Sequence, residues 1–286
     1  MTEAVACACH HHLAYARRLE SGLELLECQG CGLYARRDLP AADRLAAHYR
    51  TEYWVRYATE QTTDARANVF RHVMKRVREH HPREGSLLDV GCGPGLLLDH
   101  AGATGWSGVG IEPSMEAARI GQQAGRHIIV GEWPEIEWPD QSTDAVVFLN
   151  VLDHLRHPVA AMQAAWRVLR PDGVVYLRVP NGPFHVRLLA HRWPTAVSRL
   201  SVFHLYGFGA KALRTLLNGV GFVDVAVRTA PLSQQDAYVA EACRSDWSRR
   251  ITKAGLAAGY RVASAVGLDR YPWGPSLEAI AVKRGG

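Results

Sequence analysis

The sequence predicts an α/β fold: a Rossmann-like, seven-stranded, mostly parallel sheet whose last strand is antiparallel, with helices on both faces. Two observations lead to this prediction. From residue 86 onward, short apolar stretches typical of strands alternate with helical stretches, and such alternation builds a parallel sheet that helices cover on both sides. A glycine-rich turn also separates the first apolar stretch from the helix after it, as in many folds of this class. A length of 286 residues is enough to bury a substantial core in one large domain with appendages.

The order of the elements follows from the apolar pattern and its boundaries. Strands are expected at 86–90, 107–111, 127–130, 144–150, 173–179, 222–229 and 277–283. Helices are expected at 94–104, 114–124, 158–169 and 209–219. Pro158 suits a first helical turn, and Gly173 follows the polar turn that ends this helix. An earlier helix is expected to run to His81, because Asp64 can cap its start and Pro82 ends it.

Composition limits the classes of protein to which the chain can belong. Hydrophobic residues make up 48% of it and charged residues 21%, which fits a soluble globular enzyme. No stretch approaches the roughly 18 uncharged apolar residues that a membrane span needs, so no transmembrane segment is expected. The first residues lack the basic start and apolar stretch of a secretory signal, so a cytoplasmic location is expected. The net charge of +5 is spread along the chain, which permits a nucleic-acid partner but does not indicate one.

Three segments differ in composition. Residues 1–40 are rich in Cys and His, residues 41–85 suit a helical linker or lid, and residues 86–286 form the main domain. Two inserts interrupt the main domain. The insert at 181–208 carries aromatic residues suited either to a lid over a ligand or to packing of a connecting helix. The insert at 231–276 has an apolar face that can cover the site, form a homodimer contact or lie on a membrane surface; its residues are Ile251, Leu256, Val262 and Val266.

The N-terminal cysteines are the candidate metal ligands. Cys28 and Cys31 form a C-x2-C knuckle followed by glycine, which is a common zinc geometry. Cys7 and Cys9 are one residue closer together than usual, so that His10 or His12 can replace one of them. The pattern predicts a structural zinc held by Cys7, Cys9, Cys28 and Cys31. Reduced cysteines without a metal are the alternative.

The segment 87–96 carries the most specific chemical signal. Asp89 ends a short apolar strand, and glycines at 91, 93 and 95 leave the next turn without side chains, so a ligand can approach the backbone closely. Glu112 lies at the end of the next strand, where a carboxylate can accept hydrogen bonds from ribose hydroxyls. The third glycine comes one residue too early for the G-x-G-x-x-G pattern of dinucleotide sites. A turn that only joins strand to helix is the alternative.

The pattern Asp-x-Gly-x-Gly-x-Gly at 89–95 resembles the first motif of class I S-adenosylmethionine-dependent methyltransferases of the small-molecule type. The run at 131–147 resembles the family's gD-x-x-x-L-P-x-x-D-x-S-F-D-x-V stretch, and the run at 150–158 resembles its x-V-L-E-H-L-x-D-P. The N-terminal cysteines and the stretch around Tyr49 resemble, more loosely, a zinc-ribbon extension of one subset of these enzymes. A carboxylate beside the turn suits a ligand with a cationic amino group and a sulfonium, and would repel a phosphate.

The resemblance implies an enzyme that binds S-adenosylmethionine and methylates a small molecule of the secondary-metabolite or lipid type. The cofactor-binding residues that it implies are Asp89, Gly91, Gly93, Gly95, Glu112, Pro113, Glu132, Trp133 and Asn150. Glu132 takes an acidic position near the adenine amine, whereas Trp133 stands where the family usually has a small residue, and ordinary packing is its alternative. A non-catalytic protein of the same fold and an RNA methyltransferase are the alternative functions.

His154 is the candidate general base, because it lies one turn past the fourth strand on the side of the ligand. An oxygen or carbon acceptor must lose a proton, which requires such a base. The alternative is that Asp153 and His154 only orient the cofactor or cap a helix. His185 and His204 are weaker candidates for the same role.

Overall fold

The computed structural model describes residues 8, 13–18, 23–52, 54, 66–190, 205–232, 255, 258–260, 262 and 265–285. Its central sheet has seven strands in the order β10-β11-β8-β7-β4-β5-β6. They are β4 (Ser86–Val90), β5 (Ser107–Glu112), β6 (Ile128–Val130), β7 (Thr143–Leu149), β8 (Leu169–Pro180), β10 (Val223–Thr229) and β11 (Ser276–Val282). The five strands from β8 to β6 are parallel, and β11 is antiparallel to both of its neighbours. The predicted fold class is therefore confirmed.

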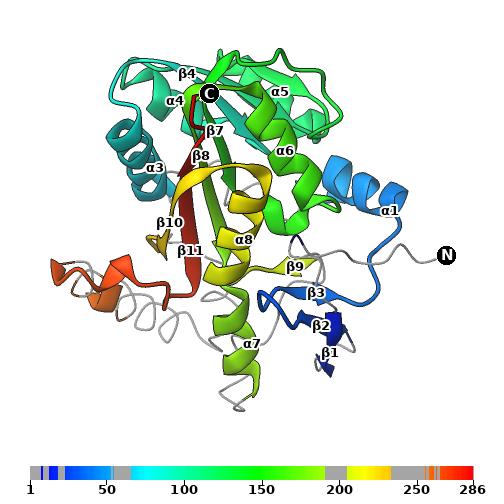
Figure 1. The fold of residues 1–286 in the computed structure, drawn as a ribbon. Coiled ribbons are helices and arrows are strands. Elements are labelled where there is room, and N and C mark those ends of the chain that lie inside the picture. The colour runs from blue at the N-terminus through cyan, green and yellow to red at the C-terminus, as the bar shows by residue number, and fades with distance from the viewer. Residues whose placement is uncertain are drawn as a thin grey trace.

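Two apolar cores lie on the two faces of this sheet, because alternate residues of a strand point to opposite sides. Leu87 and Val147 pack on one face with helices α3 (Ala67–His80), α4 (Leu96–Gly102) and α5 (Met115–Gln123). Leu88 and Phe148 pack on the other face with α6 (Pro158–Val168) and α8 (Ala210–Val220). Figure 1 shows the sheet between these two layers of helices. Burial on both faces explains why the central strands are apolar almost throughout.

A second, smaller sheet contains strands from two distant parts of the sequence. Its antiparallel order is β1-β2-β3-β9, with β1 (Leu13–Arg18), β2 (Glu24–Cys28), β3 (Tyr34–Arg36) and β9 (Tyr206–Gly207). The pairing of β3 with β9 joins the N-terminal segment to the insert at 181–208 (Figure 1). Cys28 is the last residue of β2 and Cys31 lies in the turn that leads to β3, and both side chains are buried.

Short helices complete the described fold. The helix α1 (Ala42–Ala47) and the π-helix η1 (His48–Glu52) follow the small sheet. The 3-10 helix η3 (Leu152–His154) follows β7, α7 (Gly182–Ala190) follows β8, and the 3-10 helix η4 (Leu268–Arg270) precedes β11. Among the described helices, none has the length and apolar character required to cross a membrane.

One boundary differs clearly from the sequence prediction. Strand β8 begins at Leu169, four residues before the expected start at 173, because Leu169 pairs with Thr143 before a shift in register. The expected turn at Pro171 and Asp172 is thus an irregular part of the strand. The predicted N-terminus of the helix at Asp64 lies outside the described residues, and α3 begins at Ala67.

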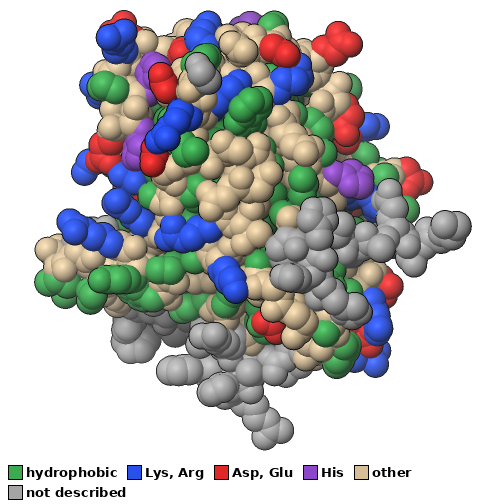
Figure 2. Space-filling view, in the orientation of Figure 1, with side chains coloured by type: hydrophobic (Ala, Val, Ile, Leu, Met, Phe, Trp, Pro, Cys, Tyr) green, Lys and Arg blue, Asp and Glu red, His purple; other side chains and the backbone are tan. Residues whose placement is uncertain are grey.

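The described part of the insert at 231–276 carries exposed apolar side chains. They are Val262, Val266, Leu268, Tyr271 and Trp273. Hydrophobic side chains gather around η4 at the lower left of Figure 2. Of the predicted apolar face, Val262 and Val266 are 65% and 66% exposed, whereas Ile251 and Leu256 lie outside the described residues. A homodimer contact through this face stays a prediction.

Candidate functional site

A cavity of about 290 Å³ opens at the carboxyl ends of β4, β5 and β7, the edge of a parallel sheet where ligands bind. Seven of the residues predicted to bind the cofactor line it: Asp89, Gly91, Glu112, Pro113, Glu132, Trp133 and Asn150. The candidate base His154 lines it too. Gly93 and Gly95 belong to the turn beside the cavity and are not among its lining residues.

The carboxylate of Glu112 is fixed to the glycine turn. One of its oxygens accepts the backbone N–H of Gly93 at 2.8 Å, and the other accepts that of Ser114 at 2.9 Å. The turn itself is tied to β5, because Gly91 N–H donates to the carbonyl of Ile111 at 2.8 Å. A carboxylate oxygen has two acceptor sites, so each oxygen of Glu112 can still accept a hydrogen bond from a ligand.

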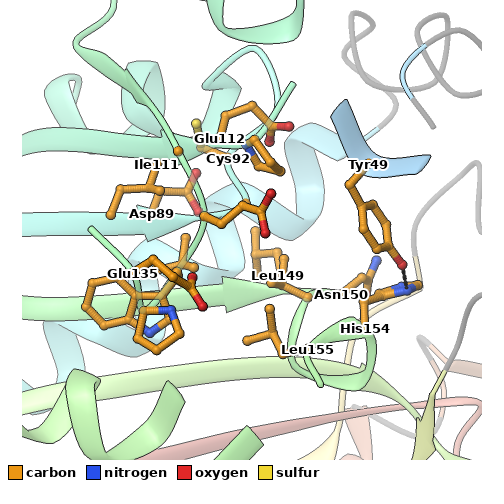
Figure 3. A pocket seen from close by; sticks show the side chains of 18 of the residues that line it. Tyr49, Asp89, Cys92, Ile111, Glu112, Glu135, Leu149, Asn150, His154 and Leu155 are labelled. Atoms are coloured by element: carbon orange, nitrogen blue, oxygen red, sulfur yellow. Dashed lines mark hydrogen bonds between the residues drawn. The ribbon is translucent and has the colours of Figure 1, made fainter. Parts of the chain in front are cut away.

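Asp89 and Glu112 place two carboxyl groups in one poorly solvated site. Burial raises the pKa of Asp89 well above its usual range, and the nearby charge of Glu112 raises it further. Burial also raises the pKa of Glu112 to about 7, although the hydrogen bonds from Ser114 and Gly93 oppose that rise. Such an acidic pair attracts a cation or a hydroxyl donor and repels a phosphate. The pair lies on one side of the cavity, opposite Tyr49 and His154 (Figure 3).

Gly91 is required by the local geometry. Its φ of +68° lies in the left-handed region, and a Cβ added there would meet Cγ2 of Val151 at 2.5 Å. Val151 itself lines the cavity. A side chain at position 91 would therefore push the wall that follows β7 out of place.

Glu132 and Trp133 are held by groups outside the turn. Glu132 accepts hydrogen bonds from Nε and Nη2 of Arg50, at 3.0 and 2.7 Å. The indole N–H of Trp133 donates to the carbonyl of Ala161 at 3.0 Å, and the side chain is 5% exposed. Trp133 thus packs in the core and also forms part of the cavity wall, while its contact with the cofactor stays a prediction.

Asn150 ends β7 with a positive φ of +57°, a conformation that asparagine tolerates better than most residues. Its Oδ1 accepts a 2.7 Å hydrogen bond from Nη1 of Arg178, a side chain that is 1% exposed. The amide NH2 group therefore lies on the side away from Arg178. Asn150 lies between the acidic pair and His154 in Figure 3. Arg178 was missed by the sequence prediction, although an arginine inside the apolar run 174–179 is a signal of a buried charge.

His154 lies in η3, and both of its ring nitrogens face polar groups. Nδ1 is 2.6 Å from the hydroxyl oxygen of Tyr49, and Nε2 is 3.6 Å from Oδ2 of Asp153. Figure 3 shows the Tyr49 hydroxyl pointing at the His154 ring. Tyr49 comes from η1, 105 residues earlier in the chain, and no local sequence pattern could have indicated this contact.

Of the other two histidine candidates, the one that the structure describes, His185, lies away from the cavity. His185 is 2% exposed, and its Nε2 is 2.9 Å from the carbonyl of Pro275, outside the cavity lining. His204 lies outside the described residues.

The described half of the predicted zinc site forms a tight turn. The backbone N–H of Cys31 points at Sγ of Cys28 over 3.5 Å. Cys7, Cys9, His10 and His12 lie outside the described residues. Within the described ranges, no group of three or more Cys, His, Asp or Glu side chains forms a metal site. The zinc thus stays a prediction.

Comparisons with known proteins place this chain in a family of methyltransferases. A family model described as a methyltransferase domain matches residues 62–227. The mitochondrial ubiquinone biosynthesis O-methyltransferase of Mus musculus is 32% identical over 124 residues, which cover 38% of this chain and 34% of that protein. An uncharacterized 37.1 kDa protein from a transposon of Streptomyces fradiae is 29% identical over 238 residues, 77% of this chain and 67% of that protein. The matched region thus spans only a third of the mouse enzyme.

Among solved structures, the 1,6-didemethyltoxoflavin-N1-methyltransferase of Burkholderia thailandensis has a TM-score of 0.55 with 15% identity. The match covers 95% of this chain and all of that one. That enzyme was crystallised with 1,6-didemethyltoxoflavin and S-adenosylhomocysteine bound. At this identity, the likeness shows a shared fold.

Proposed function

Because this chain belongs to the methyltransferase-domain family, we propose that it transfers the methyl group of S-adenosylmethionine to a small-molecule acceptor. The observation that carries the proposal is the acidic pair of Asp89 and Glu112 beside a glycine turn in one cavity. S-Adenosylmethionine carries a cationic amino group, a sulfonium and two ribose hydroxyls, all of which a pair of carboxylates attracts. When bound, it supplies a methyl group that is activated for displacement by the positive charge on sulfur.

The lining residues fit such a ligand in their chemistry. Glu112 is fixed by two backbone N–H groups and has free acceptor capacity for the ribose hydroxyls. Asp89 and the turn at Gly91 would face the amino-acid part, and Glu132 and Trp133 the adenine. Pro113 and Asn150 would complete the wall, while Gly93 and Gly95 shape the turn. Rigid, correctly oriented groups of this kind accelerate a displacement mainly by positioning.

The acceptor is proposed to be small because the chain's own N-terminal part forms one wall of the cavity. Ala42, Leu45, Ala46 and Tyr49 all line it, together with Leu155. These side chains make an apolar wall with one hydroxyl, which suits a secondary-metabolite or lipid-like molecule better than a polymer. The two named methyltransferases above, by their names, act in ubiquinone biosynthesis and on a toxoflavin precursor.

Labelled methyl transfer separates this function from its alternatives. The protein is incubated with methyl-labelled S-adenosylmethionine and a cell extract, and the label is divided by size into small molecules and macromolecules. We expect the label in the small-molecule fraction, at a rate insensitive to salt. Label in RNA, lost steeply as salt rises, would support the RNA alternative. Cofactor binding without any transfer would support the non-catalytic alternative.

His154 is proposed as the general base of the reaction, because its imidazole lines the cavity between the Tyr49 hydroxyl and the carboxylate of Asp153. Its neighbour Asp153 is 1% exposed and lies on the Nε2 side of the ring. A buried carboxylate in this position stabilises the protonated imidazole that forms when the base accepts a proton.

We further propose that Cys28 and Cys31 hold a structural zinc. Both are buried in one turn, and the Cys31 N–H points at the Cys28 sulfur, as expected for a knuckle prepared for a thiolate. The remaining ligands would come from Cys7 and Cys9, or from His10 or His12 in place of one of them. Metal analysis of the purified protein should find about one zinc per chain; less than about half an equivalent would contradict the site.

A further inference from the structure

The two contacts of the His154 ring indicate which of its nitrogens carries the proton and which can accept one. Oδ2 of Asp153 lies 3.6 Å from Nε2 of His154, a distance at which the carboxylate acts through its charge. Negative charge on that side favours the tautomer with the proton on Nε2. Nδ1 then carries the lone pair, and the Tyr49 hydroxyl donates to it over 2.6 Å.

This geometry places the Tyr49 hydroxyl in contact with the basic nitrogen of His154 at the wall of the cavity. Nδ1 of His154 faces the Tyr49 hydroxyl, and a phenolic oxygen that donates a hydrogen bond can also accept one. Tyr49 and His154 both line the cavity that holds Asp89 and Glu112. A hydroxyl group bound in this cavity can therefore reach the proton relay through the oxygen of Tyr49.

We propose that Tyr49 is a catalytic residue that takes the proton of a hydroxyl acceptor and passes its own proton to His154. This inference rests on the proposed methyl transfer. The O–H bond of the acceptor breaks, and its proton joins the Tyr49 oxygen. The original Tyr49 proton moves to Nδ1 of His154, which becomes an imidazolium next to the carboxylate of Asp153. The freed electron pair of the acceptor oxygen forms the new bond to the methyl carbon. The bond between this carbon and sulfur breaks, and its electron pair stays on sulfur.

The segment that carries Tyr49 is held over the cavity by separate contacts. Its neighbour Arg50 binds Glu132 with two hydrogen bonds, and the ring of His48 packs edge-on against Tyr49 at a centroid distance of 5.2 Å. This segment precedes residues 62–227, the part that matches the methyltransferase domain. The cofactor side of the site thus comes from the matched domain, and the acceptor side receives Tyr49 from outside it.

The class of acceptor follows from the relay and its surroundings. A base is needed for an acceptor whose proton is held too firmly to leave by itself near neutral pH, such as a phenolic hydroxyl. Leu45, Ala46 and Leu155 supply an apolar wall next to Tyr49. The relay and this wall therefore point to a weakly acidic hydroxyl on a largely apolar molecule.

Two phenols of different acidity test the relay. Phenol needs a base, whereas 4-nitrophenol is largely ionised near pH 8 without one. Methyl transfer to each is measured at high acceptor concentration with labelled S-adenosylmethionine, for wild type, Tyr49→Phe, His154→Gln and the double variant. We expect Tyr49→Phe to lower kcat for phenol by about 100-fold, within the range of general-base catalysis, and to leave 4-nitrophenol within about fivefold. The double variant should resemble either single variant, because the two residues act as one unit.

Two further measurements show whether a loss of rate comes from misfolding or from weaker cofactor binding. S-Adenosylhomocysteine affinity, measured by calorimetry, should be the same in Tyr49→Phe as in wild type. The exposed Tyr15 gives a matched control, and Tyr15→Phe should leave both rates unchanged. Equal losses on both phenols, or a phenol rate within about threefold of wild type, would overturn the relay. Wild type that binds S-adenosylhomocysteine but methylates neither phenol would overturn the hydroxyl acceptor, whereas absence of binding would overturn the proposed function itself.

Discussion

The side chain of Glu112 closes the glycine turn by accepting the backbone N–H of Gly93 over 2.8 Å. This contact crosses from the end of β5 to the loop after β4, so the carboxylate and the turn form one rigid unit. The same carboxylate has a pKa raised to about 7 by burial. The charge of Glu112 therefore changes near neutral pH, where ligand binding is readily measured.

Nucleoside binding should strengthen as the pH rises through 7. Ribose hydroxyls donate hydrogen bonds, so they bind better to the carboxylate than to the carboxylic acid and lower its pKa in the complex. With a free pKa of about 7, affinity should rise about tenfold from pH 6 to pH 8. Methylthioadenosine is the suitable probe for calorimetry, because it keeps the ribose but lacks the titratable amino group of the full cofactor.

The variant Glu112→Gln tests the assignment of this pH dependence. It should bind methylthioadenosine more weakly at pH 8, and its affinity should be nearly flat between pH 6 and pH 8. The buried neighbours Asp89 and Cys92 also have raised pKa values, and Asp89→Asn serves as the comparison. If the pH dependence of affinity persists in Glu112→Gln and disappears in Asp89→Asn, the titrating group is Asp89, which would contradict the assignment to Glu112.

Gly91→Ala should weaken cofactor binding by more than tenfold. The added Cβ would meet Val151 at 2.5 Å and displace a wall of the cavity. Gly125→Ala is the matched control, because Gly125 also has a positive φ, +83°, but no atom within 4 Å of the added Cβ. Both variants should lose about 1–2 kcal/mol of unfolding free energy from the left-handed backbone. Comparable binding losses in both variants would show that strain, and not the cavity wall, is responsible.

Removal of the Arg178 guanidinium should affect both stability and binding. Arg178 donates to Oδ1 of Asn150 and to the carbonyl of Pro231, and its loss leaves these acceptors buried without that donor. We expect Arg178→Met to lower the unfolding free energy by about 2–3 kcal/mol in urea titrations. It should also weaken S-adenosylhomocysteine binding, because the Asn150 amide can then rotate. Arg167→Met removes an ion pair between half-exposed side chains and should change stability by less than about 1 kcal/mol and binding not at all.

A buried cluster away from the cavity should set part of the acid stability. Burial raises the pKa of Glu278, but hydrogen bonds from His72 at 2.6 Å and Tyr176 at 2.8 Å, with the charge of Arg76, lower it overall. A lowered pKa in the folded state gives stability that is present above the ordinary value of 4.5 and lost as the pH falls through the folded value.

The substitutions at this cluster differ in the size of their expected effect. Glu278→Gln should lower the unfolding free energy at pH 7 by about 3 kcal/mol, because it removes the buried carboxylate that pairs with Nε of the buried Arg76. Tyr176→Phe should lower it by only about 1–2 kcal/mol, the loss of one hydrogen bond to a charged group. Urea titrations at pH 7 and about pH 3 check both, and the difference between wild type and Glu278→Gln should shrink at the lower pH, which lies below the ordinary value of 4.5. A difference that is independent of pH would contradict the electrostatic explanation.

The sequence was sufficient to predict the central sheet and to single out seven residues that line one cavity. Strands buried on both faces give continuous apolar runs, and a turn that approaches a ligand needs glycine, so both leave local patterns. Contacts between distant segments leave no such pattern. The stretch around Tyr49 indicated only a loose resemblance to a zinc-ribbon extension, and the pairing of β3 with β9 depends on segments some 170 residues apart. Arg178 is an intermediate case, since its position in a strand indicates burial but not its partner.

The binding of S-adenosylhomocysteine, measured by calorimetry at pH 8, tests the central claim most directly. Wild type should bind one equivalent, and Glu112→Ala should weaken binding by more than about tenfold, because the fixed acceptor for the ribose hydroxyls is lost. Tyr49→Phe should bind as wild type does. Folded wild-type protein that shows no binding, or Glu112→Ala that binds as tightly as wild type, would contradict the assignment of this cavity to the methyl donor.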